Sequence, residues 1–328
     1  MRPPTPRCGT FLGVAPYWSN PLSKLRRGGE NTGQQALFFD DTPPFPQVAS
    51  ESVARTARPA PLVPPGTPPM RIGVLGSGSG GNSVIVESGP HRLLIDAGFS
   101  CKEIVKRAKS LSFDPATLGA VVLTHEHQDH NKGIGVLANR FRMPVYATQG
   151  TLRGSGLAGT RLHRTVVIRS GEPVEAAGFV VEPFTIPHDA LEPVGLVVED
   201  PWGRRMGLVA DIGYRSSLAW GRLRDLDLLI LETNHDLDML RNGPYPWSLK
   251  QRVAGRHGHL SNGDAAEGVP ELLGDRLRWV VLYHLSRTNN LPTLAASAIG
   301  EALDREGCSA SLAVTEQDRP TPWLEVVS

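Results

Sequence analysis

The stretch His125-Glu126-His127-Gln128-Asp129-His130 decides how the rest of the 328-residue chain is interpreted. It directly follows the apolar run 120–123, which is typical of a short buried strand, so these polar residues should lie on a loop at a strand end. The first two imidazoles are two residues apart, a spacing that lets an extended segment direct both toward one metal ion. The aspartate and the third imidazole can turn toward a second ion. Such a set suits Zn²⁺ or Mn²⁺, and a chance cluster on a surface loop is the competing interpretation.

Further candidate ligands stand just after apolar runs that are predicted to be strands. His188, Asp211 and His284 occupy these places. Loop side chains at strand ends converge on sites that a sheet positions. A lone histidine at such a place is more often structural, but the histidine-rich loop favours one shared metal site. The three runs cover residues 179–186, 206–209 and 280–282.

The composition is that of a globular protein and excludes a membrane-spanning one. Lys and Arg number 34 against 33 Asp and Glu, hydrophobic residues make up 40% and charged residues 20%. No apolar run approaches the ~18–20 residues needed to span a bilayer. The cysteines, Cys8, Cys101 and Cys308, show no CxxC spacing, and an odd, scattered set is typical of free thiols in a reducing cytoplasm. The sequence therefore predicts a cytoplasmic protein.

Residues 1–69 differ in composition from the remainder of the chain. They contain 14 of the 28 prolines and none of the 10 histidines, with seven basic against four acidic side chains. Proline interrupts each short apolar cluster, so the segment buries too little surface to offset its ordering entropy. We expect either a disordered, proline-rich extension or a mis-called start, with Met70 as the true first residue. Residues 70–328 are long enough for one large domain with a full core.

Apolar runs and helical spacings alternate along residues 70–328. Ser100 and Glu103 form a capping box ahead of a predicted helix. Helices fall between strands, which predicts an α/β fold with sheets at the centre and helices outside. Besides the runs already named, strands are predicted at 71–75, 83–86, 93–95, 145–147, 194–198 and 228–231, and helices at 134–138, 249–253, 265–273 and 294–305.

The glycine-rich loop after the first strand imitates a dinucleotide-binding fingerprint. Gly76, Gly78 and Gly81 fit the G-x-G-x-x-G pattern, and Asp96 lies 20 residues beyond the first of them. That fingerprint requires a helix after the glycines, whose N-terminus faces the pyrophosphate. Residues 82–86 are instead rich in β-branched side chains and predict a strand. We therefore do not interpret the loop as a nucleotide site.

The order of these motifs resembles that of the metallo-β-lactamase-fold hydrolases over essentially all of residues 70–328. The resemblance implies a four-layer αββα sandwich and two divalent metal ions, Zn²⁺ or Mn²⁺. It also implies that Asp211 bridges the ions and that Asp96 orients a ligand histidine. The implied ligands are His125, His127 and His188 for one ion and Asp129, His130 and His284 for the other.

Four further motifs are similar to those of the bacterial YycJ/WalJ group. They are Leu75-Gly-Ser-Gly-Ser-Gly-Gly-Asn-Ser83, Leu231-Glu-Thr-Asn-His-Asp236, Gly258-His-Leu-Ser-Asn262 and His284-Leu-Ser-Arg-Thr-Asn-Asn290. Members of that group are described as metal-dependent nucleases with 5′-to-3′ exonuclease activity on DNA. The third motif also resembles, more distantly, a block of tRNA 3′-processing nucleases whose histidine is thought to protonate the leaving group.

The resemblance implies a phosphodiesterase that uses a metal-bridging hydroxide as nucleophile and nucleic acid, most directly DNA, as substrate. Asp129 and His259 are the expected catalytic residues, although His259 can equally cap a helix or support a ligand. Hydrolysis of a small ester, thioester, lactone or cyclic nucleotide is the alternative activity. A non-catalytic scaffold is disfavoured, because burying so many unliganded polar groups is costly. Glu232 and His235 are expected to organise the ligands, and the candidate substrate contacts are Lys250, Arg252, Asn262 and Arg287.

Overall fold

The computed structural model describes residues 63–327. The extension predicted over 1–69 therefore lies, except for its last seven residues, outside the described part of the chain. Between residues 63 and 327, no helix is both long and apolar enough to cross a bilayer. Cys101 and Cys308 are free cysteines, as the sequence predicts, and Cys8 lies outside the described residues.

Two seven-stranded sheets form the centre of the fold. Within the first sheet, neighbouring strands are β14 (Leu324–Val326), β1 (Met70–Gly76), β2 (Ser83–Ser88), β3 (His91–Ile95), β4 (Ala120–Val122), β5 (Pro144–Ala147) and β6 (Arg164–Val167). Within the second, they are β13 (Ser311–Val314), β12 (Trp279–Tyr283), β11 (Leu228–Glu232), β10 (Arg205–Val209), β9 (Val194–Glu199), β8 (Phe179–Thr185) and β7 (Val174–Ala176).

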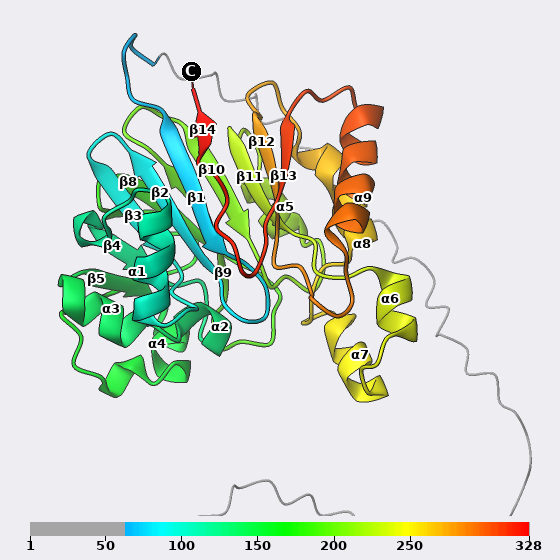
Figure 1. Ribbon diagram of the computed structural model, residues 1–328, viewed down its shortest axis with the longest axis horizontal. Helices are drawn as coiled ribbons and strands as arrows, with labels where there is room; N and C mark the ends of the chain where they lie inside the picture. The colour runs from blue at the N-terminus through cyan, green and yellow to red at the C-terminus, as the bar shows by residue number, and fades with distance from the viewer. Residues whose placement is uncertain (1–62, 328) are drawn as a thin grey trace, which may run out of the picture. The chain divides into compact units, whose positions relative to one another are not determined.

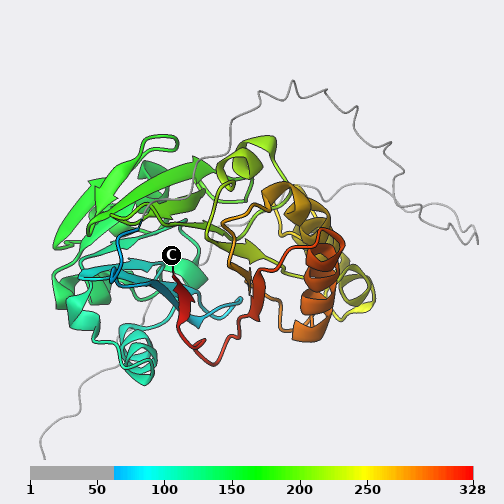
Figure 2. The same cartoon turned by 90° about the horizontal axis from the view of Figure 1, so that it is seen from above.

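Helices cover the outer faces of both sheets (Figures 1 and 2). The first sheet carries α1 (Cys101–Ser110), α3 (Ile134–Phe141) and α4 (Gln149–Gly154), and the second carries α5 (Ser217–Arg222), α8 (Asn262–Gly268) and α9 (Pro292–Arg305). Three short helices, α2 (Gln128–Asn131), α6 (Leu237–Asn242) and α7 (Trp247–Val253), lie in the connections.

Alternation along the strands explains the layers. In β2, Val84 and Val86 face the core between the sheets, whereas Ile85 packs among the helices of the first sheet. In β11, Ile230 faces the same central core and Leu229 packs among the helices of the second sheet. Strands that are apolar on both faces are typical of sheets covered on both sides. The predicted αββα arrangement is therefore confirmed.

Most predicted elements are present, but the sequence analysis missed short helices such as α4, α5 and α6 as well as the edge strands of both sheets. The Ser100 hydroxyl accepts a hydrogen bond from the Glu103 N–H at 3.3 Å, which confirms the predicted cap of α1. The glycine-rich loop leads into β2, which confirms that a strand and not a helix follows it. The sequence did not predict β6, β7, β13 or β14, which lie at sheet edges or next to them and are three or four residues long.

Polar side chains at strand ends of both sheets lie close together, at the place where the candidate ligands meet. Asp96 follows β3, Asp211 follows β10 by one residue, and His284 follows β12. All three adopt left-handed backbone conformations, with φ of 58°, 55° and 57° respectively. A non-glycine residue in this region costs about 1–3 kcal/mol and persists only where its surroundings hold it. The sharp turn at each strand end thus directs a functional side chain inward at the expense of local stability.

Candidate metal centre

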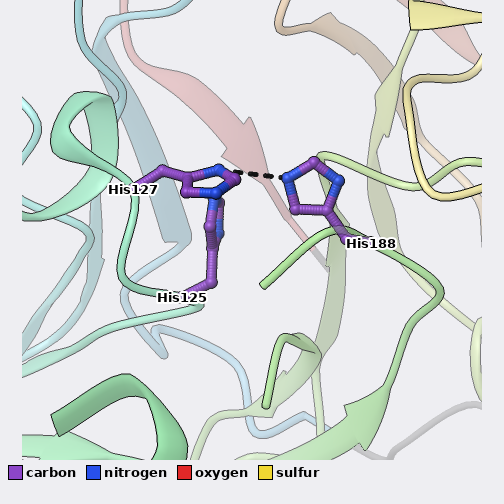
Figure 3. Close-up of side chains that lie close together, drawn as sticks. All are labelled: His125, His127 and His188. Carbon is purple, nitrogen blue, oxygen red and sulfur yellow. Dashed lines mark hydrogen bonds between the residues drawn. The ribbon is translucent and has the colours of Figure 1, made fainter. Parts of the chain in front are cut away.

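Three imidazoles meet at one side of the centre, and we call them the histidine half. His125, His127 and His188 each offer a ring nitrogen within 4.8 Å of the others (Figure 3). Nε2 of His188 lies 3.2 Å from Nδ1 of His127. Nε2 of His125 is buried and has no hydrogen-bond partner. A buried, unpaired acceptor nitrogen costs free energy unless a cation or donor satisfies it, so this trio is suited to a divalent metal ion.

A second group lies beside the first, and we call it the carboxylate half. Asp129, His130 and His284 offer ligand atoms within 4.8 Å of one another. Oδ2 of Asp129 lies 3.3 Å from Nε2 of His284 and 3.8 Å from Nε2 of His130. The mixture of imidazole nitrogen and carboxylate oxygen is again a donor set for a divalent transition metal.

Asp211 lies between the two halves. Its Oδ2 is 3.0 Å from Nε2 of His130, and its Oδ1 is 3.8 Å from Nε2 of His188. The structure therefore brings together all seven residues that the sequence proposed as ligands, with Asp211 in contact with both groups.

Two imidazoles of the histidine half, His125 and His188, are held in the neutral form. Burial lowers the pKa of His125 well below its ordinary value, and the neighbouring His130 lowers it further. Burial also lowers the pKa of His188, although Asp211 opposes the shift. Neutral imidazoles have a free lone pair, which is the form that coordinates a metal ion.

The carboxylate half holds charged groups that compensate one another. Burial alone would lower the pKa of His284, but Asp211, Asp129 and Glu232 outweigh it and raise the pKa to about 10. For His130, Asp211 and Asp96 likewise overcome burial and raise the pKa well above its ordinary value. Burial would raise the pKa of Asp211, but the imidazoles around it hold that pKa well below the usual range. Carboxylates and imidazoles on this side thus stabilise one another in their charged forms.

Asp96 fixes the loop that carries the ligands. Its Oδ2 accepts from Nδ1 of His130 at 2.7 Å, which turns Nε2 of that ring toward Asp211. Its two oxygens also accept from the backbone N–H and the hydroxyl of Thr124, at 2.8 and 2.9 Å. Thr124 in turn lies 3.0 Å from Nδ1 of His125. A carboxylate behind a ligand histidine fixes both the tautomer and the ring orientation.

Glu232 connects the centre to His259. The carboxylate is fully buried and accepts from the backbone N–H of Ile212 at 2.7 Å and of Leu260 at 3.2 Å. Its Oε1 lies 2.8 Å from Nδ1 of His259 and 3.0 Å from Nδ1 of His284. Burial would raise the pKa of Glu232, but His259 and the hydrogen bonds lower it to about 2.

His259 stands at the edge of the centre. Its Nδ1 faces Glu232 and lies 3.5 Å from Oδ1 of Asp211, so the opposite ring nitrogen, Nε2, points away from both carboxylates. The side chain is 22% exposed. Burial lowers its pKa, but the Glu232 carboxylate outweighs burial and raises the pKa above the ordinary value.

His235 does not contact the ligands through its ring. Both ring nitrogens are buried without a hydrogen-bond partner, and burial lowers the pKa of the imidazole to about 4. Its carbonyl accepts from the backbone N–H of Asn262 at 2.8 Å. His235 therefore joins two of the sequence motifs through its backbone rather than through its side chain.

The predicted substrate contacts do not form one cluster. Lys250 donates to the carbonyl of Arg241 at 2.6 Å, and Asn262 is buried, with its amide paired to that of Asn290 at 2.8 and 2.9 Å. Arg287 is paired with Asp318 at 2.5 Å. The amide pair orders the protein interior and leaves Asn262 no surface toward a substrate.

Arg252 is the exception, because an aspartate links it to the centre. Its guanidinium donates to Oδ2 of Asp189 at 2.7 and 2.6 Å. Oδ1 of Asp189 lies 3.3 Å from Nε2 of His188 and 3.8 Å from Nε2 of His127. Sequence reasoning assigned no role to Asp189, although its position directly after His188 was an available signal.

Asn82 is a second residue that sequence reasoning missed. Its backbone N–H donates to the carbonyl of Asp129 at 2.7 Å. Its side-chain oxygen accepts from the hydroxyl of Ser77 at 3.1 Å and from the N–H of Gly78 at 2.9 Å. The glycine-rich loop thus folds around Asn82 and holds the ligand loop. Only the position of the asparagine at the end of the glycine run hinted at this role.

The chain matches known proteins along most of its described length. A family model described as "Beta-lactamase superfamily domain" matches residues 91–284. Exodeoxyribonuclease WalJ of Streptococcus pneumoniae is 34% identical over 266 residues, which cover 78% of this chain and 98% of that protein. Exodeoxyribonuclease YycJ of Bacillus anthracis is 33% identical over 240 residues, covering 73% and 90% respectively.

A solved structure shows the same fold. The metallo-β-lactamase fold protein YhfI from Bacillus subtilis superposes with a TM-score of 0.59 at 20% identity, over 77% of this chain and 99% of that one. The two sheets and the helices on their outer faces agree with this fold. The chain therefore belongs to the β-lactamase superfamily of metal-dependent hydrolases, in the group that includes YycJ and WalJ.

Proposed function

We propose that this protein is a metal-dependent phosphodiesterase that degrades DNA as a 5′-to-3′ exonuclease. The observation that carries the proposal is the placement of His259, which Glu232 holds at the edge of the metal centre with one ring nitrogen directed away from both carboxylates. The names of the two curated relatives, which align over 90% and 98% of their lengths, support DNA as the substrate.

We propose that two divalent cations, Zn²⁺ or Mn²⁺, are held by the residues described above. His125, His127 and His188 would hold one, Asp129, His130 and His284 the other, and Asp211 would bridge them. When bound, a pair of such ions activates water as a nucleophile and stabilises charge on the phosphate oxygens. Asp129 is thus the catalytic carboxylate of the carboxylate half. The buried, unpaired Nε2 of His125 supports this assignment.

His259 supplies the proton for the leaving group. Cleavage of a phosphodiester releases a poorly stabilised alkoxide, which leaves faster when an acid protonates it. The Glu232 carboxylate orients the His259 ring through Nδ1, so that Nε2 is the nitrogen available to the leaving oxygen. A thiolate, whose conjugate acid has a pKa of about 8.5, needs such help far less. The pair therefore favours a phosphodiester over a thioester.

The test is hydrolysis of end-labelled duplex DNA in the presence of Mn²⁺ or Zn²⁺. We expect stepwise release of mononucleotides from the 5′ end, and no hydrolysis by Asp211→Ala or His130→Ala. Equal activity in these variants would contradict the proposal. RNA of the same sequence, and DNA blocked at either end, are the controls for substrate and polarity.

Hydrolysis of a small ester, thioester, lactone or cyclic nucleotide is the alternative, because the same fold carries these activities. A panel of such substrates distinguishes the two. Turnover of a thioester or lactone far above that of DNA would replace the nuclease assignment.

A further inference from the structure

An exposed tyrosine lies near the candidate metal centre, in a segment that is hydrogen-bonded to the residues next to the proposed ligands. Tyr214 lies three residues after Asp211, within about 11 Å along even a fully extended chain. It is 37% exposed, and the guanidinium of Arg256 lies 4.7 Å from the centroid of its ring. An aromatic ring offers a large nonpolar face, and tyrosine and tryptophan are enriched at binding surfaces for this reason.

Backbone contacts hold this ring in register with the ligands. The N–H of Gly213 donates to the carbonyl of Pro187 at 2.8 Å, and the N–H of Asp189 donates to the carbonyl of His257 at 3.1 Å. A side chain at Gly213 would collide with the carbonyl of Arg256, since a Cβ there would lie 2.2 Å from that oxygen. The segments after Asp211, around His188 and before His259 therefore form one rigid assembly.

Basic side chains outnumber acidic ones in the stretch of sequence that contains Arg256. Residues 237–257, which include the two yellow helices α6 and α7 of Figure 1, carry four basic side chains and one acidic one. The whole of residues 70–328 carries 27 basic and 29 acidic side chains, so this segment is a local exception. None of the residues of α7 is buried. Basic side chains attract the phosphates of a single strand, and aromatic rings stack its bases.

We propose that Tyr214, backed by Arg256, is a stacking platform for the nucleobase adjoining the scissile phosphate. The proposal rests on the phosphodiesterase function above and adds to it a binding subsite for single-stranded nucleic acid. Stacking accepts every base, because each has a π-face, so the platform positions the strand without selecting its sequence. The guanidinium of Arg256 lies against the ring and supports its orientation through a cation–π contact.

Abasic substrates test the platform. An oligonucleotide with one abasic nucleotide is compared with the intact oligonucleotide, the lesion being placed in turn at each of the three positions next to the cleavable end. We expect Tyr214→Leu, which keeps apolar bulk without a π-face, to lower kcat/KM on the intact strand about tenfold. At one lesion position the unmodified protein should lose about as much, and Tyr214→Leu should lose nothing further. Tyr214→Phe, which keeps the ring, should behave as the unmodified protein.

Three results overturn the platform alone. The first is full activity of Tyr214→Leu on the intact strand. The second is that the abasic lesion lowers kcat/KM of Tyr214→Leu by the same factor as it lowers that of the unmodified protein, at every lesion position. Trp247, the other exposed aromatic side chain of this region, gives a third such result. If the abasic lesion causes no further loss in Trp247→Leu but does so in Tyr214→Leu, the platform is Trp247 and the proposal is wrong.

Hydrolysis of bis(4-nitrophenyl) phosphate by the unmodified protein keeps the two proposals apart. This substrate has no nucleobase, so its cleavage supports the phosphodiesterase function whatever the tyrosine does. If the unmodified protein cleaves neither this ester nor DNA, the phosphodiesterase function fails and the platform falls with it. Thermal unfolding of each variant confirms that the exposed substitution leaves the fold intact.

Discussion

The two halves of the candidate metal centre lie side by side but differ in the side chains that form them. The histidine half has three imidazoles, with Asp211 and the partly exposed Asp189 beside them, whereas the carboxylate half contains Asp129 and is backed by the buried Glu232 and Asp96. His127 is also 30% exposed, whereas His130 is fully buried. A cation in the histidine half would therefore have fewer buried carboxylates around it and would lie nearer to solvent. We therefore expect that ion to exchange first and the other to be retained longer.

The largest effect should come from removing the group that both halves share. Asp211→Asn keeps the size of the side chain but removes its charge, so neither ion is balanced as before. We expect kcat/KM on DNA to fall by at least about a thousandfold, since several kcal/mol of transition-state stabilisation depends on the ions. A decrease below tenfold would show that Asp211 does not bridge.

Next in size is the loss of the proton donor, which should leave both halves loaded. His259→Ala should lower kcat on DNA by about 10²–10⁴-fold while metal content stays unchanged. Glu232→Gln should act in the same direction through the orientation of the His259 ring. The check is a phosphodiester with a 4-nitrophenolate leaving group, which needs no proton. Equal losses on both substrates would show that His259 acts through the metals instead.

Removing a ligand from the exposed half should separate the two ions. His127→Ala should lose about one ion per chain and lower activity by about a hundredfold. Mutation of a residue that only supports a metal ligand already lowers metal affinity or activity by about 10–100-fold, so loss of a ligand should cost at least as much. The matched control is His163→Ala, an exposed histidine remote in sequence from every ligand. Loss of both ions from His127→Ala would mean that the halves do not bind independently.

A smaller effect is expected from the carboxylate behind the carboxylate half. Asp96→Asn should weaken the binding of the ion held there by about 10–100-fold, because His130 loses its orienting charge. Calorimetric titration of the metal-free variant measures this directly. A weakening confined to the histidine half would contradict the assignment of Asp96 to His130.

The smallest effect is expected from removing residues 1–62, which contribute no residue to either half. We propose that residues 70–328 form the hydrolase domain, so a chain lacking residues 1–62 should keep full activity and thermal stability. Residues 63–69 should stay, because the carbonyl of Pro68 accepts a hydrogen bond at 2.7 Å from the buried Arg204. A marked loss of DNA hydrolysis would show that the first segment takes part in function.

The same contrast shows how far the sequence could predict the site. The convergence of the proposed ligands was predictable, because strand ends converge and these residue types are typical of metal sites. The role of Asn82 was not, since its contacts with Asp129 depend on how a glycine loop folds across 47 residues of chain. The short edge strands were missed because β14 contains only three residues and gains its strand conformation from pairing with β1.

The candidate substrate contacts stay predictions, and their surroundings could not be foreseen. Arg252 and Arg287 were chosen for their charge and their nearness to motifs, but each is paired with an aspartate from a distant segment, Asp189 and Asp318. Pairing of surface charges depends on side-chain geometry that no local pattern encodes. Tyr214 carries no motif at all, and only its exposure and its contact with Arg256 draw attention to it.

The most direct test of the two-half centre is the metal content of the purified protein, measured by mass spectrometry after dialysis against Zn²⁺ or Mn²⁺ and brief desalting. The account predicts two ions per chain, with one of them lost first under a weak chelator and that one missing from His127→Ala. One ion per chain in the unmodified protein, or none, would contradict it.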